Sequence, residues 1–198
     1  MKKLFIATGN KNKVYEFKLI FDELGLDIEL LCPKDFNDDT EPVEDGLTFE
    51  ENAIIKAKYY FDKYHIPTIA DDSGMCIEFL NGFPGIYSAR FMGSYSYPEK
   101  NDAIIKIMED SPNRNATFNC VVAYIDEEGV THTFEGINHG TIAYKQAGSE
   151  GFGFDPLFVI PEYNKTEAEL GFAYKNKYSH RAIATKKFAE YYKDRVKD

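Results

Sequence analysis

The sequence is poor in cysteine and has no long apolar run. Its three cysteines, Cys32, Cys76 and Cys120, form no Cys-x-x-Cys pair, so neither a disulfide framework nor a zinc site is expected. The apolar residues that follow the basic start, 4–7, are too few for a signal peptide. No later run approaches the roughly 18 to 20 residues of a membrane span. The sequence therefore predicts a cytoplasmic protein with reduced thiols.

Several motifs that mark well-known chemistry are also missing. The chain has no Gly-x-Ser-x-Gly nucleophile turn, no His-Glu-x-x-His zinc helix, no dinucleotide-binding fingerprint and no Walker phosphate loop. Positive charge is scarce as well, because 23 Lys and Arg residues face 33 Asp and Glu residues and leave a formal net charge of −10. Such a chain is repelled by nucleic acid polymers and by anionic lipid, so we expect neither as a partner.

What the sequence does contain is typical of a globular α/β protein. A hydrophobic fraction of 43% and an aromatic fraction of 15% suffice for a buried core in one domain, residues 1–198. Short apolar runs alternate with helical patterns in the first half, and a hairpin pattern follows in the second. We therefore predict a mixed central sheet with flanking helices. The expected strands are 3–7, 28–31, 68–70, 75–80, 116–125, 130–138 and 156–160, and the expected helices are 11–24, 48–64, 98–109 and 179–196.

A tight turn leads from the first expected strand into the first helix. Gly9 lets a phosphate approach the main chain, and the free N–H groups of a helix start attract anions. Lys11 and Lys13 stand in the first helical turn, where a cation is disfavoured by roughly 0.3 to 1 kcal/mol, and a bound polyphosphate would reverse that cost. An ordinary turn with solvated lysines explains the same pattern. The candidate phosphate-binding residues are Thr8, Gly9, Asn10, Lys11, Asn12 and Lys13.

A pair of aspartates follows the expected strand 68–70. Because adjacent strand residues point to opposite faces, one of Asp71 and Asp72 should face a cleft and the other the scaffold. A carboxylate at the carboxyl end of a strand can hold Mg²⁺ or activate a water molecule. The alternative is a polar turn, Asp71-Asp72-Ser73-Gly74, whose aspartates satisfy backbone donors.

Acidic residues also precede the second expected helix. One of them could add a ligand to a magnesium site, because Mg²⁺ is usually bound by one or two carboxylates together with substrate phosphates. A solvated acidic surface is the alternative. The residues concerned are Glu41, Glu44, Asp45, Glu50 and Glu51.

Two later segments combine residue types that suit a nucleobase. In Gly151-Phe152-Gly153-Phe154-Asp155-Pro156 the phenylalanines alternate with glycines, and such rings either stack on a base or pin a loop to the core. Ser179 is a predicted helix N-cap that places His180 and Arg181 in the first turn of the last helix. Together with Lys175 just before it, this second group of cations at a helix start indicates an anionic or carbonyl-rich ligand.

These segments, in this order, resemble the inosine triphosphatase family, also called the Ham1 or RdgB-like non-canonical purine nucleoside triphosphate pyrophosphatases. One such motif is weakly specific, but a full set in register from residue 8 to residue 181 is highly specific. The matching motifs are Thr8-Gly9-Asn10-x-x-Lys13, Thr48-Phe49-x-Glu51-Asn52-Ala53, Ala70-Asp71-Asp72-Ser73-Gly74, Gly82-x-Pro84-Gly85-Ile86-Tyr87-Ser88-Ala89-Arg90, Gly151-Phe152-Gly153-Phe154-Asp155-Pro156 and Ser179-His180-Arg181.

The resemblance implies hydrolysis of inosine and xanthosine triphosphates, including the deoxy forms, to the monophosphate and pyrophosphate. It also implies Mg²⁺ as cofactor, a two-lobed α/β fold with the site in the cleft, and a homodimer. By the motif match, residues 8–13 would hold the triphosphate, Asp72 would be the general base and a metal ligand, and Ser73 would contact substrate. Lys56 would also reach phosphate. It is assigned to the face of the expected helix 48–64 opposite the apolar stripe, which consists of Ala53, Ile54, Ala57, Phe61 and Tyr64. The residues that would recognise the base are Phe152, Gly153, Phe154, Asp155, Lys175, His180 and Arg181.

The chain departs from the family pattern at two places. The family commonly has tyrosine where this chain has Phe154, so any contribution from that hydroxyl is absent. The acidic ligand upstream of Asp72 is altered too, because Val43-Glu44-Asp45-Gly46 keeps only one of two consecutive acids at the matching positions. Glu44 is the predicted metal ligand, with Asp45 as the alternative.

The residues suggest a mechanism in which Asp72, with Mg²⁺, deprotonates a water that attacks the α-phosphorus, while lysines near residues 8–13 stabilise the leaving pyrophosphate. Donors that face O6 of hypoxanthine would reject adenine, whose 6-amino group is itself a donor. Three other interpretations remain. They are a Maf-like pyrophosphatase for pyrimidine or modified nucleotides, a non-catalytic purine-nucleotide sensor, and an RNA-binding module, which the net charge disfavours.

Overall fold

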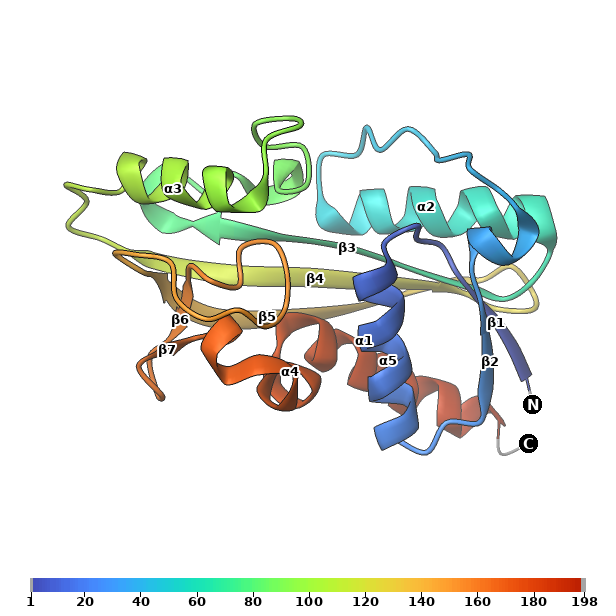
Figure 1. The fold of residues 1–198 in the computed structure, drawn as a ribbon. Helices are drawn as coiled ribbons and strands as arrows, with labels where there is room; N and C mark the ends of the chain where they lie inside the picture. Colours follow the sequence, from blue (N-terminus) through green and yellow to red (C-terminus); the bar gives the residue numbers. More distant parts are fainter. Residues whose placement is uncertain (1, 197–198) are drawn as a thin grey trace. The chain divides into compact units, whose positions relative to one another are not determined.

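The computed structural model describes residues 2–196 and has a seven-stranded sheet in the order β2-β1-β3-β4-β5-β6-β7 (Figure 1). The predicted mixed sheet with flanking helices is therefore confirmed. The strands are β1 (Lys2–Ile6), β2 (Ile28–Leu31), β3 (Thr68–Ile77), β4 (Asn115–Ile125), β5 (Thr131–Ile142), β6 (Phe158–Ile160) and β7 (Lys165–Thr166). The helices are α1 (Lys11–Glu23), α2 (Phe49–Tyr64), α3 (Tyr97–Ile107), α4 (Glu167–Tyr178) and α5 (His180–Val196).

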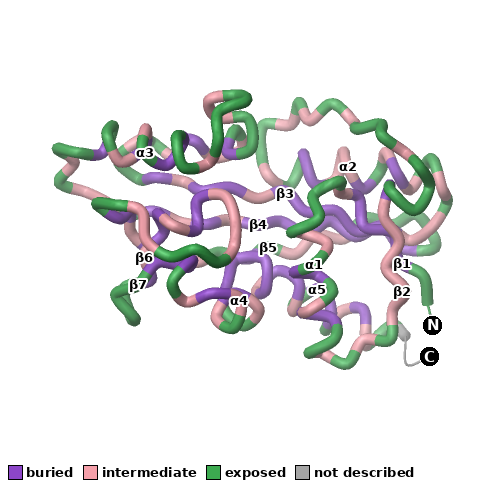
Figure 2. Tube along the Cα trace, viewed as in Figure 1, coloured by how far each residue is buried: buried purple, intermediate pink, exposed green. Residues whose placement is uncertain are grey.

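Burial is extensive along β1, β3 and β4 (Figure 2). In β1 the consecutive residues Leu4, Phe5 and Ile6 are all fully buried, and β3 is buried along almost its whole length. Continuous burial of this kind is typical of strands that are covered on both faces. Within residues 2–196, no helix combines the length and the apolar composition that crossing a bilayer requires.

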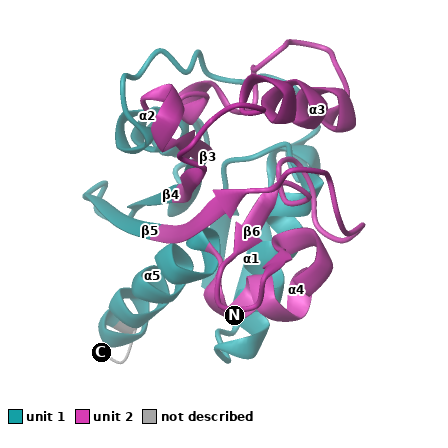
Figure 3. Cartoon of the chain, turned by 90° about the vertical axis from the view of Figure 1, so that its left-hand side faces the viewer, with its two compact units in different colours: residues 1–72, 120–136, 180–198 teal, residues 73–119, 137–179 magenta. Residues whose placement is uncertain are grey.

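The chain forms two compact units (Figure 3). Unit 1 consists of residues 1–72, 120–136 and 180–198, and unit 2 consists of residues 73–119 and 137–179. The strands β3, β4 and β5 each contribute residues to both units. Each unit has its own core, so each is described separately.

In unit 1, helices cover both faces of the strands (Figure 1). β1 pairs in parallel with β2 and with β3. Its alternate residues enter different cores, because Ile6 packs with Phe17 of α1 and Phe188 of α5, whereas Phe5 packs with Ala57 of α2. The helix α1 therefore covers the same face as α5, and α2 covers the opposite face. This two-sided arrangement decides what each aspartate of β3 meets.

In unit 2, one core joins the end of β3 to α3, β6 and α4. Its buried members include Met75, Ile104 and Phe158. α3 starts one residue before the predicted position, with Ser96 as N-cap and the carboxylate of Glu99 accepting from the Ser96 backbone N–H. The helix α4 was not predicted, because it is short and it is kinked at a glycine whose φ is 69°.

The largest difference from the sequence prediction lies in β3. Two strands, 68–70 and 75–80, were expected, with the first ending at 71–74, but the structure has one strand from Thr68 to Ile77 followed by a short 3₁₀ turn, Glu78–Leu80. The segment Asp71-Asp72-Ser73-Gly74 has turn-forming composition, yet tertiary ion pairs satisfy its carboxylates and keep it extended. The aspartates therefore lie in the middle of a strand and not at its carboxyl end.

Candidate active site

The predicted phosphate turn is a helix N-terminus with local capping. Asn10 is the N-cap of α1, and its side-chain oxygen accepts from the Asn12 N–H at 2.9 Å. The hydroxyl of Thr8 accepts from the Asn10 N–H at 3.1 Å. The helix α1 begins at Lys11, as expected. Its first turn contains no acidic residue that would complement the positive end of the helix dipole.

Gly9 is not required by the fold of the turn. Its φ lies outside the left-handed region, and a Cβ built on it would lie 3.5 Å from Glu41 Oε1, an ordinary contact. The exposed backbone at this position is therefore open to close approach by a ligand, which is the use that the sequence predicts for it.

On the α1–α5 face of β3, Asp71 is enclosed by cations. Its Oδ2 lies 2.9 Å from Lys13 Nζ and 3.0 Å from Arg181 Nη2. Arg181 also forms an ion pair with Glu16 of α1, and the side chains of Asp71, Glu16 and Arg181 are all buried. Burial alone would raise the pKa of Asp71, but the charges of Lys13 and Arg181 hold that pKa far below its usual range.

On the α2 face of the same strand, Asp72 meets a single lysine. Its Oδ1 lies 3.0 Å from Lys56 Nζ, and the same ammonium lies 3.3 Å from Glu44 Oε2. Burial raises the pKa of Asp72 even though Lys56 and Lys13 act in the opposite direction. Burial would lower the pKa of Lys56, but the carboxylates of Asp72, Asp71 and Glu44 outweigh it and raise that pKa, so the ammonium stays charged.

The placement of Lys56 corrects the sequence analysis. Lys56 was expected on the α2 face opposite the apolar stripe, but it lies four residues after Asn52 and four before Tyr60, both of which are buried. Its side chain is only 11% exposed. The buried face of α2 was predicted from its apolar residues alone. The face that packs on the sheet also carries the polar residues Asn52 and Lys56, so the predicted face is rotated about the helix axis relative to the real one.

Asn52 is a site residue that the sequence analysis did not assign. It is fully buried, and its amide donates to Asp72 Oδ2 at 3.4 Å while its oxygen accepts from the Gly46 N–H at 2.9 Å. Asn52 thus joins the segment that carries Glu44 to the aspartate. The sequence signal that could have revealed it is its position: Asn52 is a polar residue beside the apolar Ala53 within the helix. Capping does not explain it, because Thr48 is already the N-cap.

Glu44 and Asp72 are the carboxylates that suit a divalent cation. Among the described residues there is no group of three or more His, Cys, Asp and Glu side chains arranged around one point. The carboxylates of Glu44 and Asp72 are nevertheless donors that suit Mg²⁺. This ion is commonly bound by one or two carboxylates and completes its shell with water and substrate phosphates. The alternative ligand Asp45 is exposed.

Unit 2 holds a second cluster, around Asp155. The Asp155 carboxylate accepts from Lys175 Nζ at 2.7 Å and from the Phe152 N–H at 2.7 Å. Lys175 Nζ also lies 4.6 Å from the centroid of the Phe152 ring. Gly151 has a φ of 82°, and a Cβ there would lie 2.1 Å from Asp155 Oδ2, so the loop requires glycine at this position.

Two of the predicted base-recognition residues have different surroundings from those expected. Phe154 is 4% exposed and packs edge-on against Tyr97 at 5.4 Å between ring centroids, so its side chain belongs to the core. Lys175 lies just before the last helix, as expected, but it is part of α4 and its ammonium is buried against Asp155. Phe152 is the ring of the pair that stays partly exposed.

The remaining predicted residues divide between the units. Arg181 and His180 are buried at the start of α5 in unit 1, and Ser179 has the extended backbone expected of a residue that precedes a helix. Ser73 and Gly153 are partly exposed in unit 2. In unit 1 the structure thus forms two ion-pair groups on adjacent residues of β3, one that joins Lys13 and Arg181 through Asp71 and one that joins Asp72 and Glu44 through Lys56. In unit 2 it brings Phe152, Asp155 and Lys175 together.

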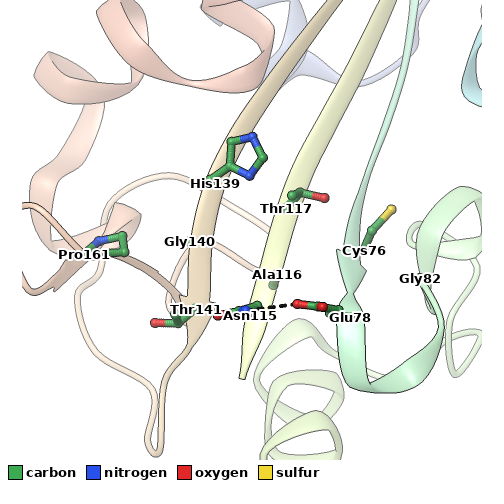
Figure 4. A pocket seen from close by; sticks show the side chains of 10 residues that line it. All are labelled: Cys76, Glu78, Gly82, Asn115, Ala116, Thr117, His139, Gly140, Thr141 and Pro161. Carbon is green, nitrogen blue, oxygen red and sulfur yellow. Dashed lines mark hydrogen bonds between the residues drawn. The ribbon is translucent and has the colours of Figure 1, made fainter. Parts of the chain in front are cut away.

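A separate cavity of about 590 Å³ lies in unit 2 and contains none of the predicted site residues. Figure 4 shows its lining, in which the amide of Asn115 donates to Glu78 at 2.9 Å and the side chains of Cys76 and His139 come from different strands. It offers no cluster of cations for a phosphate. We therefore place the candidate active site at β3 of unit 1.

The fold and this site define the class of protein: an α/β protein whose lysines and carboxylates converge on adjacent residues of one strand, a donor set suited to phosphate and a divalent cation. The chain belongs to the Ham1 family, whose model matches residues 4–191. It is 44% identical to the dITP/XTP pyrophosphatase of Photorhabdus laumondii subsp. laumondii, over 94% of this chain and 95% of that protein.

Solved structures show the same relationship. The Ham1 protein of Staphylococcus aureus has a TM-score of 0.87 at 34% identity, and a HAM1 protein from Coxiella burnetii has a TM-score of 0.88 at 33% identity. In both comparisons 98% of this chain and 100% of the other chain are covered. The family resemblance predicted from the motifs is therefore confirmed.

Proposed function

We propose that this protein hydrolyses non-canonical purine nucleoside triphosphates, ITP and XTP and their deoxy forms, to the nucleoside monophosphate and pyrophosphate, and so removes them from the nucleotide pool. The observation that carries the proposal is the pair of adjacent aspartates with different partners. Asp71 anchors Lys13 and Arg181, whereas Asp72 faces Lys56 and Glu44. The names of the relatives supply the substrate class.

The protein groups divide the reaction between them. The carboxylate of Asp72 accepts a proton from a water molecule, whose oxygen attacks the α-phosphorus as the bond to the bridging oxygen of the β-phosphate breaks. The raised pKa of Asp72 favours proton acceptance. Lys13, Lys56 and the backbone N–H groups at the start of α1 bind the triphosphate and the departing pyrophosphate.

Glu44 and Asp72 would hold Mg²⁺. When bound, the ion would supply positive charge that offsets the charge of the triphosphate. Asn52 fixes the orientation of Asp72 through its amide and links that carboxylate to the segment of Glu44. This arrangement fits an ion that takes few protein ligands and keeps several waters.

Base recognition is assigned to the residues of the motif match. In unit 2, Phe152 would offer the stacking surface, and Asp155 orders the loop and fixes Lys175. Lys and Arg side chains donate only, so those that face the base select a carbonyl at position 6 over an amino group. His180 would act with Arg181, whose guanidinium is already bound by carboxylates of unit 1. A homodimer and a cytoplasmic location remain predictions from the sequence.

A substrate panel tests the proposal directly. Pyrophosphate release is measured from ITP, XTP, ATP, GTP and CTP, with and without Mg²⁺, at slightly alkaline pH. We expect fast, metal-dependent turnover of ITP and XTP and slow turnover of the others. Preferred turnover of CTP would support the Maf-like alternative, and tight ITP binding without turnover of any nucleotide would support the sensor.

A further inference from the structure

Lys56 occupies the point where Glu44 and Asp72 converge. Its Nζ lies 3.0 Å from Asp72 Oδ1 and 3.3 Å from Glu44 Oε2. The Lys56 side chain is 11% exposed and the Asp72 side chain 10%, while that of Glu44 is 29% exposed. The two carboxylates are the predicted metal ligands, so their counter-ion in this structure is a side chain of the protein.

An ammonium and a divalent cation cannot share this position. Magnesium binds carboxylate oxygens at about 2.0 to 2.1 Å, which is closer than either contact of Lys56 Nζ. An ion held by both carboxylates would compete with the ammonium for their charge, and like charges a few ångströms apart repel strongly in partly buried surroundings. The binding of a divalent cation would therefore weaken the contacts of the ammonium with Glu44 and Asp72.

We propose that Lys56 is an exchangeable internal counter-ion. Its ammonium neutralises Glu44 and Asp72 until a divalent cation binds to them, and the displaced ammonium is then free to bind a phosphate oxygen of the substrate. This inference rests on the proposed function, because it assigns the cation site to the same two carboxylates. The exchange couples the binding of the cation to that of the nucleotide, since the triphosphate provides a new partner for the lysine that the cation displaces.

Lys13 does not have this property. Its partner is Asp71, which also binds Arg181 and lies on the opposite face of β3. A cation at Glu44 and Asp72 leaves that ion pair in place. Lys58 supplies a matched comparison on α2, because it is exposed and forms its ion pair with Asp62, four residues along the same helix.

The first test measures Mn²⁺ binding to nucleotide-free protein by electron paramagnetic resonance of the unbound ion. Lys56→Met removes the competing charge and keeps an apolar stem. We therefore expect the variant to bind Mn²⁺ roughly tenfold or more tightly than the unaltered protein. A tenfold change corresponds to only a fraction of the Coulomb energy between two charges about 4 Å apart. Lys56→Arg keeps the charge and Lys58→Met changes a remote one, so both should bind like the unaltered protein. Equal or weaker binding by Lys56→Met would overturn the proposal.

The second test needs no variant and covers the case in which Lys56→Met does not fold. The unaltered protein is labelled with an amine-acylating reagent, and the labelled peptides are quantified by mass spectrometry with and without MgCl₂. We expect Mg²⁺ to increase the labelling of Lys56 several-fold and to leave that of Lys58 unchanged. Constant or decreased labelling of Lys56 would contradict the exchange.

These measurements are independent of the proposed reaction. If the unaltered protein fails to hydrolyse ITP or XTP while Lys56→Met binds Mn²⁺ more tightly, the function is wrong and the exchange stands. If the unaltered protein hydrolyses ITP and neither Mn²⁺ affinity nor Lys56 labelling responds, the exchange is wrong and the function stands.

Discussion

Asp71 and Asp72 are neighbours in one strand, and their surroundings are opposite. Asp71 lies on the α1–α5 face between Lys13 and Arg181, and its pKa is held far below the usual range. Asp72 lies on the α2 face with Lys56, which it shares with Glu44, and its pKa is raised by burial. The alternation of a strand thus places two identical side chains in two electrostatic environments.

The difference separates two roles. A carboxylate that two buried cations keep ionised is a poor proton acceptor, but it is a strong anchor for those cations. A carboxylate with a raised pKa and one shared cation can accept a proton and can exchange its counter-ion. The experiments that follow test this separation, beginning with the largest expected effect.

Replacing Asp72 by asparagine should abolish turnover and leave nucleotide binding. We expect kcat for ITP to fall by roughly 100- to 10,000-fold, the usual contribution of a positioned general base, while the affinity measured by calorimetry changes little. Pyrophosphate release gives the rate. A variant that turns over ITP at a near-normal rate would remove Asp72 from the catalytic role.

Replacing Asp71 by asparagine should mainly lower stability. Lys13 and Arg181 would then lack the carboxylate that balances them, and breaking a buried ion pair from one side costs about 3 to 5 kcal/mol. Urea unfolding measures the loss of stability. The control is Asp62→Asn at an exposed position of α2, which should show no measurable change. Equal stability losses for Asp71→Asn and Asp72→Asn would erase the proposed distinction.

Replacing Asn52 by leucine should impair the α2 face alone. The variant removes the amide that donates to Asp72 and the oxygen that accepts from the Gly46 N–H. We expect kcat to fall roughly 10- to 100-fold, as when a supporting hydrogen bond to a metal ligand is lost, with a much smaller change in KM. An effect on KM alone would show that Asn52 serves binding and not the orientation of Asp72.

Another buried aspartate, Asp126, extends the comparison outside the site. Burial would raise its pKa, but hydrogen bonds from His132 and from the backbone N–H groups of Val130 and Glu128 outweigh burial and lower the pKa. Arg195 of α5 lies 3.1 Å from the same carboxylate. Because the folded pKa is below the unfolded value of about 3.9, its stabilisation is present above that value and is lost as pH falls through the folded pKa.

The corresponding test compares Asp126→Asn with the unaltered protein across pH. We expect the variant to be less stable by about 1 to 2 kcal/mol near pH 6, the scale of a charge-assisted hydrogen bond. The difference should shrink below pH 4, as measured by urea unfolding at each pH. A difference that stays constant down to pH 3 would show that the charge of Asp126 does not contribute.

Much of the site could be read from the sequence because its signals are local. The start of α2 is fixed by neighbouring residues, because the Thr48 hydroxyl accepts from the Glu51 N–H and the Glu51 carboxylate accepts from the Leu47 N–H. The alternation of Asp71 and Asp72 was also correct, since it follows from strand geometry alone.

Other features depended on residues far away in the chain. The sequence predicted that the strand ends at 71–74, but ion pairs from Lys13, Lys56 and Arg181 keep this polar segment within β3. Lys175 was predicted from the motif match to recognise the base, and only the structure shows that its ammonium pairs with Asp155. Composition cannot reveal which distant charge neutralises a buried one.

The sequence by itself determined the family, the α/β class, the caps and the face that each strand residue takes, because motifs and periodicity are carried by neighbouring residues. Only the tertiary structure decided that Asp71 pairs with Lys13 and Arg181, whereas Asp72 pairs with Lys56 and shares it with Glu44. The physical reason is that the pKa and the counter-ion of a buried carboxylate depend on the helices packed against its face of the sheet, and their packing is set by the whole core.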